Sequence, residues 1–282
     1  MKVVIFCGGL GLRMRTQVDS APKPMMTIGD RPVLWHIMRY YAHFGHTEFI
    51  LCLGYGAASV KEYFLHYDET HSNDFVLSKG GQSIELLETD ISEWRISFIE
   101  TGIDTSIGER LRRVRHLLDD DEVFLANYGD VLTDAPLNQI IDEFIASGAT
   151  ASLLAVPPQE SFHVVKMDHD CTVTGIKSVA SLPLWENGGY FVLRQGVFDV
   201  LQRGEDLVGD AFPRLVQQGR LKAVRHTGFW APMDTLKERS LLEDLHRSGE
   251  APWKLWARTP EEPGPSLSGT AATTAEQALE RA

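Results

Sequence analysis

The sequence predicts an α/β fold organised around a parallel sheet, and three stretches near its start carry this prediction. Val3–Phe6 and Phe49–Leu53 are short apolar runs, which are typical of buried strands. Between them, residues 33–41 place apolar side chains on one face of a helix. Strand, helix and strand in this order favour a right-handed parallel unit. The length of 282 residues allows one such domain with a sizeable core.

The elements begin and end at recognisable signals. The first helix follows a turn that ends at Pro32, a residue favoured near a helix start. Residues 96–99 and 123–126 are further apolar runs that we expect to be strands. A helix is expected from Pro136 to Phe144, with Asp134 as its cap, and another after Asp234. Apolar runs thus alternate with helical stretches along most of the chain.

Composition narrows the class of partner and the compartment. The formal charge of −12 argues against non-specific nucleic-acid binding, because there is no basic excess to neutralise phosphates. Cys7, Cys52 and Cys171 show no paired spacing, which indicates a reducing compartment. No segment approaches the roughly 18 apolar residues of a membrane span. We therefore expect a cytoplasmic protein that binds neither nucleic acid nor membrane.

A glycine-rich loop directly follows the first strand. Gly8, Gly9 and Gly11 leave room for a close approach of a bulky anion and free amide groups that can point at phosphate oxygens. Arg13 adds a planar donor fork, and Lys23 adds a point charge held between two prolines. Glycines and cations in this order predict a cradle for a triphosphate.

Two other readings of this loop are weaker. The Gly-Lys-Ser/Thr ending of a P-loop is absent. Met14 stands where a dinucleotide-binding fingerprint has its third glycine, so a nicotinamide-dependent oxidoreductase is disfavoured. A purely structural turn stays open for the glycines considered alone.

Candidate ligand-binding residues follow several strand ends. Ligands of such sheets gather beyond the carboxyl ends of the strands, where Gly54-Tyr55 and Gly129-Asp130 stand. Asp130 suits a magnesium ligand, although a capping aspartate is the alternative. Asp234 precedes a helical run and is, on local evidence alone, a helix cap. Arg110 belongs to a basic run, 110–115, which is typical of a solvated helix face.

The combination resembles the nucleotidyltransferases that make sugar nucleotides. Their first loop carries Gly-Gly-x-Gly, an arginine and then Pro-Lys-Pro, as in residues 8–24 here, although Leu12 replaces a small hydroxylated residue. Residues 228–235, Gly-Phe-Trp-Ala-Pro-Met-Asp-Thr, are similar to the glucose-1-phosphate cytidylyltransferase branch, as are residues 35–38 and 217–219. The resemblance covers residues 1 to about 257. It implies one domain, 1–258, followed by a tail, 259–282, whose composition predicts disorder.

The resemblance implies a fold, a cofactor and a set of site residues. The fold is Rossmann-like and three-layered, with a mixed, mostly parallel sheet flanked by helices. Arg13 and Lys23 would contact the phosphates, and Asp130 and Asp234 would bind Mg²⁺. A homo-oligomer is also implied. The remaining nucleotide-binding positions are Gly8, Gly9, Gly11, Gly54, Tyr55, Arg110 and Gly129, and the sugar-binding positions are Tyr128, His163, Lys177 and Asn187.

The sequence departs from the family where the sugar should bind. Ser178-Val179-Ala180 replaces a Glu-Lys-Pro whose lysine neutralises the sugar phosphate. Lys177 is a substitute only if the strand is shifted, because a one-residue offset points to the opposite face. His163 stands where the family has glycine, and Ile107 replaces a hydroxylated residue of the cytidylyl branch. These changes affect positions that are expected to select the sugar acceptor and the nucleobase.

The reaction predicted is transfer of a nucleotidyl group, CMP from CTP, to a sugar 1-phosphate, with release of pyrophosphate. The acceptor phosphate is largely dianionic at neutral pH, with a second pKa of about 6, so no general base is needed. Two alternatives stay open. In the first, the enzyme uses a base other than cytosine, or an acceptor other than glucose 1-phosphate, namely a modified hexose, pentose, heptose or cyclitol phosphate. In the second, the protein binds a nucleotide without catalysis.

Overall fold

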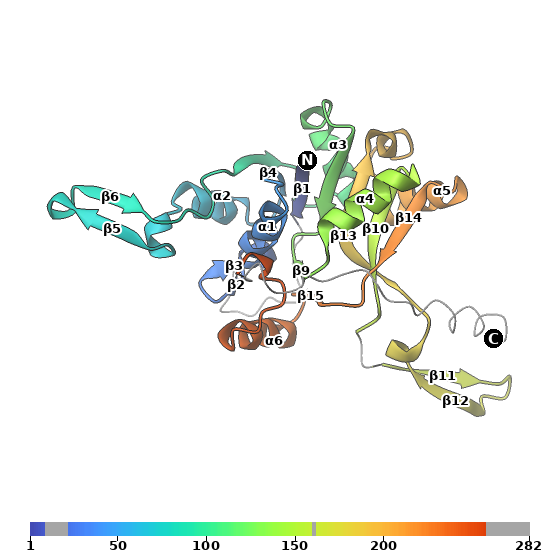
Figure 1. Ribbon diagram of the computed structural model, residues 1–282. Helices are drawn as coiled ribbons and strands as arrows, with labels where there is room; N and C mark the ends of the chain where they lie inside the picture. Colours follow the sequence, from blue (N-terminus) through green and yellow to red (C-terminus); the bar gives the residue numbers. More distant parts are fainter. Residues whose placement is uncertain (9–21, 160–161, 258–282) are drawn as a thin grey trace.

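A seven-stranded mixed sheet forms the centre of the protein (Figure 1). The computed structural model describes residues 1–8, 22–159 and 162–257. The strand order is β14-β10-β13-β8-β1-β4-β7, and every neighbouring pair is parallel except the two that include β13. The strands are β1 (Lys2–Cys7), β4 (Glu48–Leu53), β7 (Arg95–Glu100), β8 (Val123–Asn127), β10 (Ala151–Val156), β13 (Glu186–Arg194) and β14 (Leu221–Arg225).

Helices cover both faces of this sheet. One face packs against α1 (Val33–His43), α4 (Leu137–Ser147) and α6 (Leu236–Arg247), and α2 (Ala57–Leu65) adds Val60 to the same cluster. The other face packs against α3 (Ile107–Val114) and α5 (Phe212–Gln217). Alternate residues of β1 serve the two clusters, which explains why the whole strand is apolar. The predicted three-layer α/β fold with a mostly parallel sheet is confirmed.

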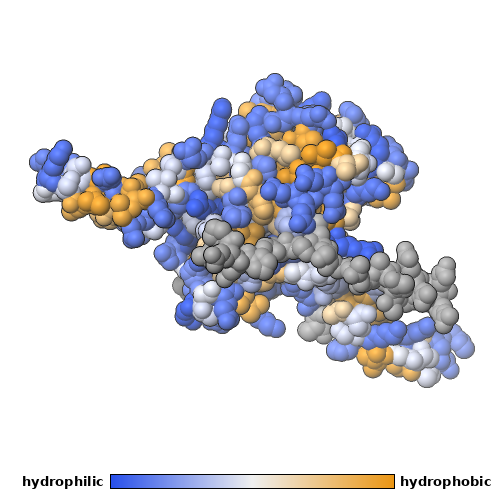
Figure 2. Space-filling model, in the orientation of Figure 1, coloured by the Kyte–Doolittle hydropathy of each residue, from blue (hydrophilic) through white to orange (hydrophobic). Residues whose placement is uncertain are grey.

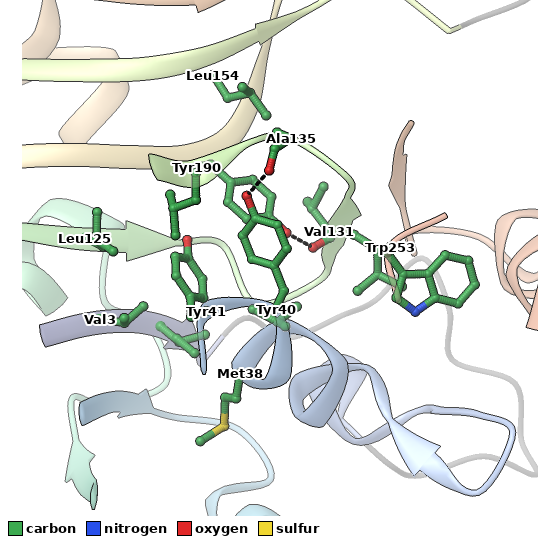
Figure 3. Packing of buried hydrophobic residues seen from close by; sticks show 14 of the residues in the cluster. Val3, Met38, Tyr40, Tyr41, Leu125, Val131, Ala135, Leu154, Tyr190 and Trp253 are labelled. Carbon is green, nitrogen blue, oxygen red and sulfur yellow. Dashed lines mark hydrogen bonds between the residues drawn. The ribbon is translucent and has the colours of Figure 1, made fainter. Parts of the chain in front are cut away.

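Tyrosines of the core fix the segment that follows β8. The hydroxyl of Tyr40 on α1 donates to the carbonyl oxygen of Ala135 at 2.7 Å, and that of Tyr190 on β13 donates to Val131 at 2.7 Å (Figure 3). Both hydroxyls are buried, so these bonds satisfy groups that would otherwise be costly to bury. Segment 131–135, which starts directly after Asp130, is therefore anchored to the core at two points.

Four two-stranded ribbons complete the architecture. Two lie near the sheet edge, β2 (Thr27–Ile28) with β3 (Arg31–Pro32), and β9 (Val131–Thr133) with β15 (Trp230–Pro232). The other two project from the body, β5 (Phe75–Ser78) with β6 (Ser83–Leu86), and β11 (His163–Met167) with β12 (Val173–Ser178) (Figure 1). Apolar side chains are exposed on both projecting hairpins, as the orange surface in Figure 2 shows.

The structure corrects the expected role of Asp134 and does not describe the tail or most of the glycine-rich loop. Asp134 does not cap α4, since Pro136 is the residue before that helix and no side chain caps it. The predicted tail, 259–282, lies outside the described residues, as do Gly9, Gly11 and Arg13 of the glycine-rich loop. Across the described residues, none of the helices is long and apolar enough to cross a membrane.

Candidate active site

A short ribbon brings two distant aspartates together. Asp130 directly precedes β9, and Asp234 lies two residues after β15. These strands pair antiparallel, and the amide of Met233 also donates to the carbonyl oxygen of Asp130 at 2.9 Å. Two carboxylates about a hundred residues apart in sequence are thus held at the same edge of the sheet, as the sequence predicted.

Lys23 stands between these two carboxylates. Its Nζ lies 3.2 Å from Asp130 Oδ2 and is in close contact with Asp234 Oδ1. Lys23 begins a single 3₁₀ turn, Lys23–Met25, which the amide of Met26 closes on the lysine carbonyl oxygen at 3.0 Å. One ammonium therefore contacts two carboxylates that approach it from different segments.

The protonation of this cluster reflects burial and charge together. Burial raises the pKa of Asp130 to about 6; the neighbouring ammonium of Lys23 opposes this shift, and Asp234 adds to it. Burial alone would lower the pKa of Lys23, but the charges of Asp130 and Asp234 outweigh it, so that the pKa is raised. Lys23 stays protonated at neutral pH, and Asp130 is ionised above its shifted pKa.

The end of β1 is fixed by Arg110 on α3. Its guanidinium is buried and uses all five N–H groups on acceptors at the ends of three strands and the loop before α3. Nη2 donates to the carbonyl oxygens of Gly8 at 2.9 Å and Ile103 at 3.0 Å. The remaining donations go to Leu53 O, Thr101 Oγ1 and Thr105 O. Arg110 was expected on a basic helix face, yet it points inward, because these oxygens supply the acceptors that a buried guanidinium needs.

Gly129 and Tyr128 position the end of β8. Gly129 has φ +82°, and a Cβ there would lie 2.9 Å from the carbonyl oxygen of Phe6, so that only glycine fits without strain. The hydroxyl of Tyr128 accepts a hydrogen bond from Asn187 Nδ2 at 2.8 Å. The predicted sugar-binding pair is therefore in direct contact.

A cavity of about 560 Å³ opens above these groups. Five of the predicted residues line it, namely Gly8, Lys23, Arg110, Tyr128 and Asp130. Residues 103–106 of the loop before α3, Ile107 and Asp206 also line it. Of these, only Ile107 was singled out in the sequence, because residues 103–106 and Asp206 belong to loops without a motif.

Seven of the predicted site residues that the structure describes do not line this cavity, namely Gly54, Tyr55, Gly129, His163, Lys177, Asn187 and Asp234. Gly54 ends β4 beside the backbone of Gly8, where a Cβ would lie 2.7 Å from the carbonyl oxygen of Gly8. Tyr55 follows it, half-buried. His163 and Lys177 belong to the β11–β12 hairpin, where they pair with Ser178 and Val164. In this antiparallel register His163 and Lys177 face opposite sides of the hairpin.

The segment that leads to Asp234 has its own supports. Asp134 Oδ1 accepts from the amide of Phe229 at 2.8 Å and contacts His226 Nε2 at 2.9 Å. The cap of α6 is Thr235, in a capping box with Glu238, so Asp234 is not the cap. Glu238 Oε2 also accepts from the amide of Asp234 at 2.7 Å. Thr235 and Glu238, rather than Asp234, therefore supply the side-chain contacts at the start of this helix.

The chain matches proteins of known activity along most of its length. The family model described as "Nucleotidyl transferase" matches residues 2–245. A glucose-1-phosphate cytidylyltransferase from Salmonella typhimurium is 37% identical over 261 residues, which cover 91% of this chain and 100% of that protein. A relative from Bacillus subtilis is 35% identical over 258 residues, with the same coverage of both chains.

Solved structures share the fold at low sequence identity. A Bacillus anthracis protein in complex with a sucrose has a TM-score of 0.64 and 16% identity, over 87% of this chain and 95% of that one. HddC from Yersinia pseudotuberculosis has a TM-score of 0.61 and 18% identity, over 87% and 99%. Fold, site geometry and the match over residues 2–245 agree, and the chain belongs to the nucleotidyl transferase family.

Proposed function

We propose that this nucleotidyltransferase transfers CMP from CTP to a sugar 1-phosphate and releases pyrophosphate, as a glucose-1-phosphate cytidylyltransferase does. The observation that carries the proposal is the meeting of Lys23, Asp130 and Asp234 at the cavity that Gly8 borders. The 37% identity to the Salmonella typhimurium cytidylyltransferase supports the choice of CTP and glucose 1-phosphate.

The residues support a mechanism of positioning and charge neutralisation. The acceptor phosphate is the nucleophile, and it is already largely dianionic at neutral pH. Lys23 would neutralise charge near the α-phosphate, while Arg13 and the amides of Gly8, Gly9 and Gly11 would hold the β- and γ-phosphates. No general base is required, so the pair of aspartates is available for a metal ion.

The aspartate pair fits a magnesium ion. Asp130 and Asp234 converge on one cation, the ammonium of Lys23, which stands in for a metal ion in this structure. Both ligands are carboxylate oxygens, which Mg²⁺ prefers, and substrate phosphates would supply further ligands. Among the described residues, no group of three or more acidic, histidine or cysteine side chains is arranged to hold a metal ion, so ligands from the substrate are needed. Bound there, magnesium would stabilise charge on the α-phosphate.

The other predicted positions divide into two groups. We propose that Gly54, Tyr55, Arg110 and Gly129 shape the nucleotide site, Arg110 acting through the loops that its five hydrogen bonds hold. Tyr128 and Asn187, joined at 2.8 Å, would contact the sugar. His163 and Lys177 face opposite sides of the β11–β12 hairpin, so only one of them would reach the acceptor from it.

We further propose a cytoplasmic homo-oligomer. Exposed apolar side chains on the two projecting hairpins support self-association, since an isolated two-stranded ribbon is only marginally stable in water. The described cysteines, Cys7, Cys52 and Cys171, are all free, which suits a reducing compartment.

The reaction is tested by pyrophosphate release. The protein is incubated with magnesium, glucose 1-phosphate and each of the five common triphosphates in turn, with Asp130→Asn as the inactive control. Fastest release with CTP is expected. Release only with another triphosphate would contradict the choice of CTP, and release only with another phosphorylated acceptor would contradict the choice of glucose 1-phosphate. Nucleotide binding without release across a broad acceptor panel would instead indicate a relative that has lost catalysis.

A further inference from the structure

Asp206 lines the cavity that Lys23 also lines. It precedes the helical turn Leu207–Ala211, where Oδ1 accepts from the amides of Val208 at 2.9 Å and Gly209 at 2.8 Å. Within the described part of the chain, Oδ2 accepts no hydrogen bond from another residue. One oxygen thus holds the side chain in place, and the other is available to a ligand.

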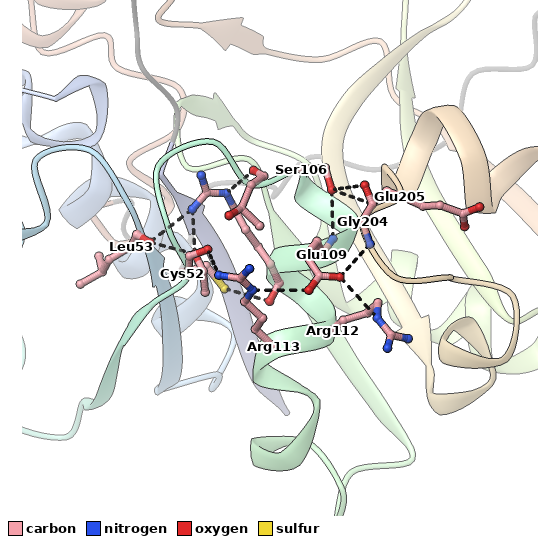
Figure 4. Close-up of polar contacts among 11 residues, drawn as sticks. Cys52, Leu53, Ser106, Glu109, Arg112, Arg113, Gly204 and Glu205 are labelled. Atoms are coloured by element: carbon pink, nitrogen blue, oxygen red, sulfur yellow. Dashed lines mark hydrogen bonds and ion pairs between the residues drawn. The ribbon is translucent and has the colours of Figure 1, made fainter.

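The loop that carries Asp206 is firmly held. Ser106 Oγ, at the start of α3, donates to the carbonyl oxygens of Gly204 at 3.2 Å and Glu205 at 2.7 Å, and Glu109 Oε2 accepts from the amide of Gly204 at 2.9 Å (Figure 4). Glu205 in turn pairs with both terminal nitrogens of Arg214, at 2.6 and 2.5 Å. Because these contacts hold the loop, the carboxylate of Asp206 needs little reorganisation to bind a ligand.

Side chains of opposite charge line the cavity. Lys23 suits a phosphate, whereas the negative charge of Asp206 repels phosphate and accepts from N–H or O–H donors. Asp104 also borders the cavity, but its side chain is exposed and lies on the loop before α3. Asp130, the third carboxylate that lines the cavity, is paired with Lys23 and proposed for the metal ion, so Asp206 is the fixed carboxylate that is left to discriminate between ligands.

The neighbouring residues indicate which part of the substrate meets Asp206. The cavity is lined by Gly8 and by residues 103–107. Three of its lining residues, Gly8, Lys23 and Arg110, are proposed for the nucleotide, whereas among the described residues proposed for the acceptor only Tyr128 lines it. This lining favours the nucleoside over the acceptor as the part of the substrate that reaches Asp206. The donors of a nucleoside are the ribose hydroxyls and, in cytosine, the exocyclic amino group.

We propose that Asp206 is a specificity-determining residue that accepts a hydrogen bond from the nucleoside part of the triphosphate. This inference rests on the proposed nucleotidyl transfer and adds the residue that selects the nucleoside. If the donor is the amino group, Asp206 favours CTP over UTP. Uracil carries the oxygen O4 in place of this amino group, and an oxygen cannot donate a hydrogen bond to the carboxylate. If the donor is a ribose hydroxyl, Asp206 favours ribonucleotides over deoxyribonucleotides.

The test compares Asp206→Asn with wild type. The asparagine amide oxygen can keep the helix cap, while its NH₂ group replaces the acceptor Oδ2 with a donor. Asp210→Asn is the matched control, because Asp210 Oδ2 accepts from the amide of Asp206 at 2.8 Å but lies outside the cavity. Binding of a non-hydrolysable CTP analogue is measured by calorimetry, and KM is measured for CTP, UTP, 2′-deoxy-CTP, 3′-deoxy-CTP and the acceptor.

Asp206→Asn should weaken analogue binding and raise the KM for CTP by roughly 10- to 100-fold, the usual cost of a lost hydrogen bond to a charged group. The KM for the acceptor should stay within about twofold, and Asp210→Asn should behave like wild type. A collapse of the CTP-over-UTP ratio identifies the amino group as donor. An unchanged ratio with loss of discrimination against either deoxy-CTP identifies a hydroxyl.

Unchanged analogue binding in Asp206→Asn, or an effect confined to the acceptor, would overturn the inference. Failure of wild-type protein to bind any nucleotide would overturn the proposed function instead, so that the two failures are distinguishable.

Discussion

Gly8 and Arg110 are packed so closely that no side chain fits at position 8. A Cβ there would overlap Nη1 of Arg110 and lie 2.7 Å from Nη2. The guanidinium cannot move aside, because it is 3% exposed and already donates to five acceptors. The packing of Arg110 thus suffices to require a glycine as the first residue of the loop.

Gly8→Ala should therefore destabilise the protein and abolish activity. Displacing Arg110 would leave buried carbonyl oxygens without donors, and overpacking of this kind costs about 1–3 kcal/mol. Thermal unfolding and pyrophosphate release measure both effects. Gly175→Ala is a suitable control, since the nearest heavy atom to its Cβ would be 3.9 Å away. A Gly8→Ala protein with wild-type melting and turnover would show that Arg110 does not constrain this loop.

Asp130→Asn should reduce turnover by several powers of ten while the protein stays folded. The amide keeps the shape of the carboxylate but removes the charge that holds Lys23 and would hold the metal ion. Turnover at saturating magnesium is the measurement, with Asp244→Asn on the exposed face of α6 as control. Near-normal turnover of Asp130→Asn would end its assignment as a metal ligand.

The sequence predicted those parts of the site that local pattern and family resemblance specify. The parallel unit of β1, α1 and β4 followed from apolar periodicity, and the family resemblance implied that Asp130 and Asp234 meet, whereas the contact of Lys23 with both was not predicted. Both predictions depend on features that short stretches of sequence carry.

The remaining features depend on tertiary neighbours that no local pattern reveals. Arg110 reads locally as part of a solvated basic run, and its burial is made favourable by five acceptors from distant segments, among them the carbonyl oxygens of Gly8 and Leu53. Asp206 lies in a loop without a motif and reaches the cavity because Ser106 and Arg214 hold that loop. Chemistry that depends on contacts between distant loops was therefore missed.

Glu238→Ala should impair catalysis more than its effect on stability explains. Glu238 Oε2 accepts from the amides of Asp234 at 2.7 Å and Thr235 at 2.8 Å, so it positions a proposed metal ligand as well as the helix start. Thr235→Ala removes only the cap, at about 1 kcal/mol, and is the matched control. The apparent magnesium affinity should fall in Glu238→Ala alone. Equal affinities in the two variants would restrict Glu238 to a capping role.

A charge on a projecting hairpin should dissociate the oligomer. Leu77 on β5 is 58% exposed in the single chain, and burial against another copy would be prevented by a lysine. Light scattering should give a smaller mass for Leu77→Lys than for wild type. Val216→Lys, at an apolar side chain that is 61% exposed on α5, should leave the mass unchanged. A wild-type protein that is monomeric at micromolar concentration would contradict the proposed self-association.

His36 should make the fold sensitive to acid. This buried ring contacts the carbonyl oxygen of Ile28 through Nε2 at 3.1 Å, and Nδ1 accepts from the indole N–H of Trp253 at 3.4 Å. An indole nitrogen only donates, so Nδ1 is unprotonated and the ring is neutral. Burial lowers the pKa of His36 to about 3. In the unfolded chain His36 is therefore protonated below about pH 6.5, whereas in the folded protein it stays neutral down to about pH 3.

The stability that this difference contributes is complete above about pH 6.5 and is lost as pH falls toward 3, at about 1.4 kcal/mol per pH unit. Urea unfolding at pH 7.5 and 5 should show this loss in wild type and a smaller loss in His36→Gln. Burial also lowers the pKa of His46, to about 4, so some acid sensitivity should persist in that variant. His71→Gln, a change at a side chain that is 82% exposed, should retain the wild-type loss. If His36→Gln and wild type lose stability equally, the neutral buried ring is not the source of the acid sensitivity.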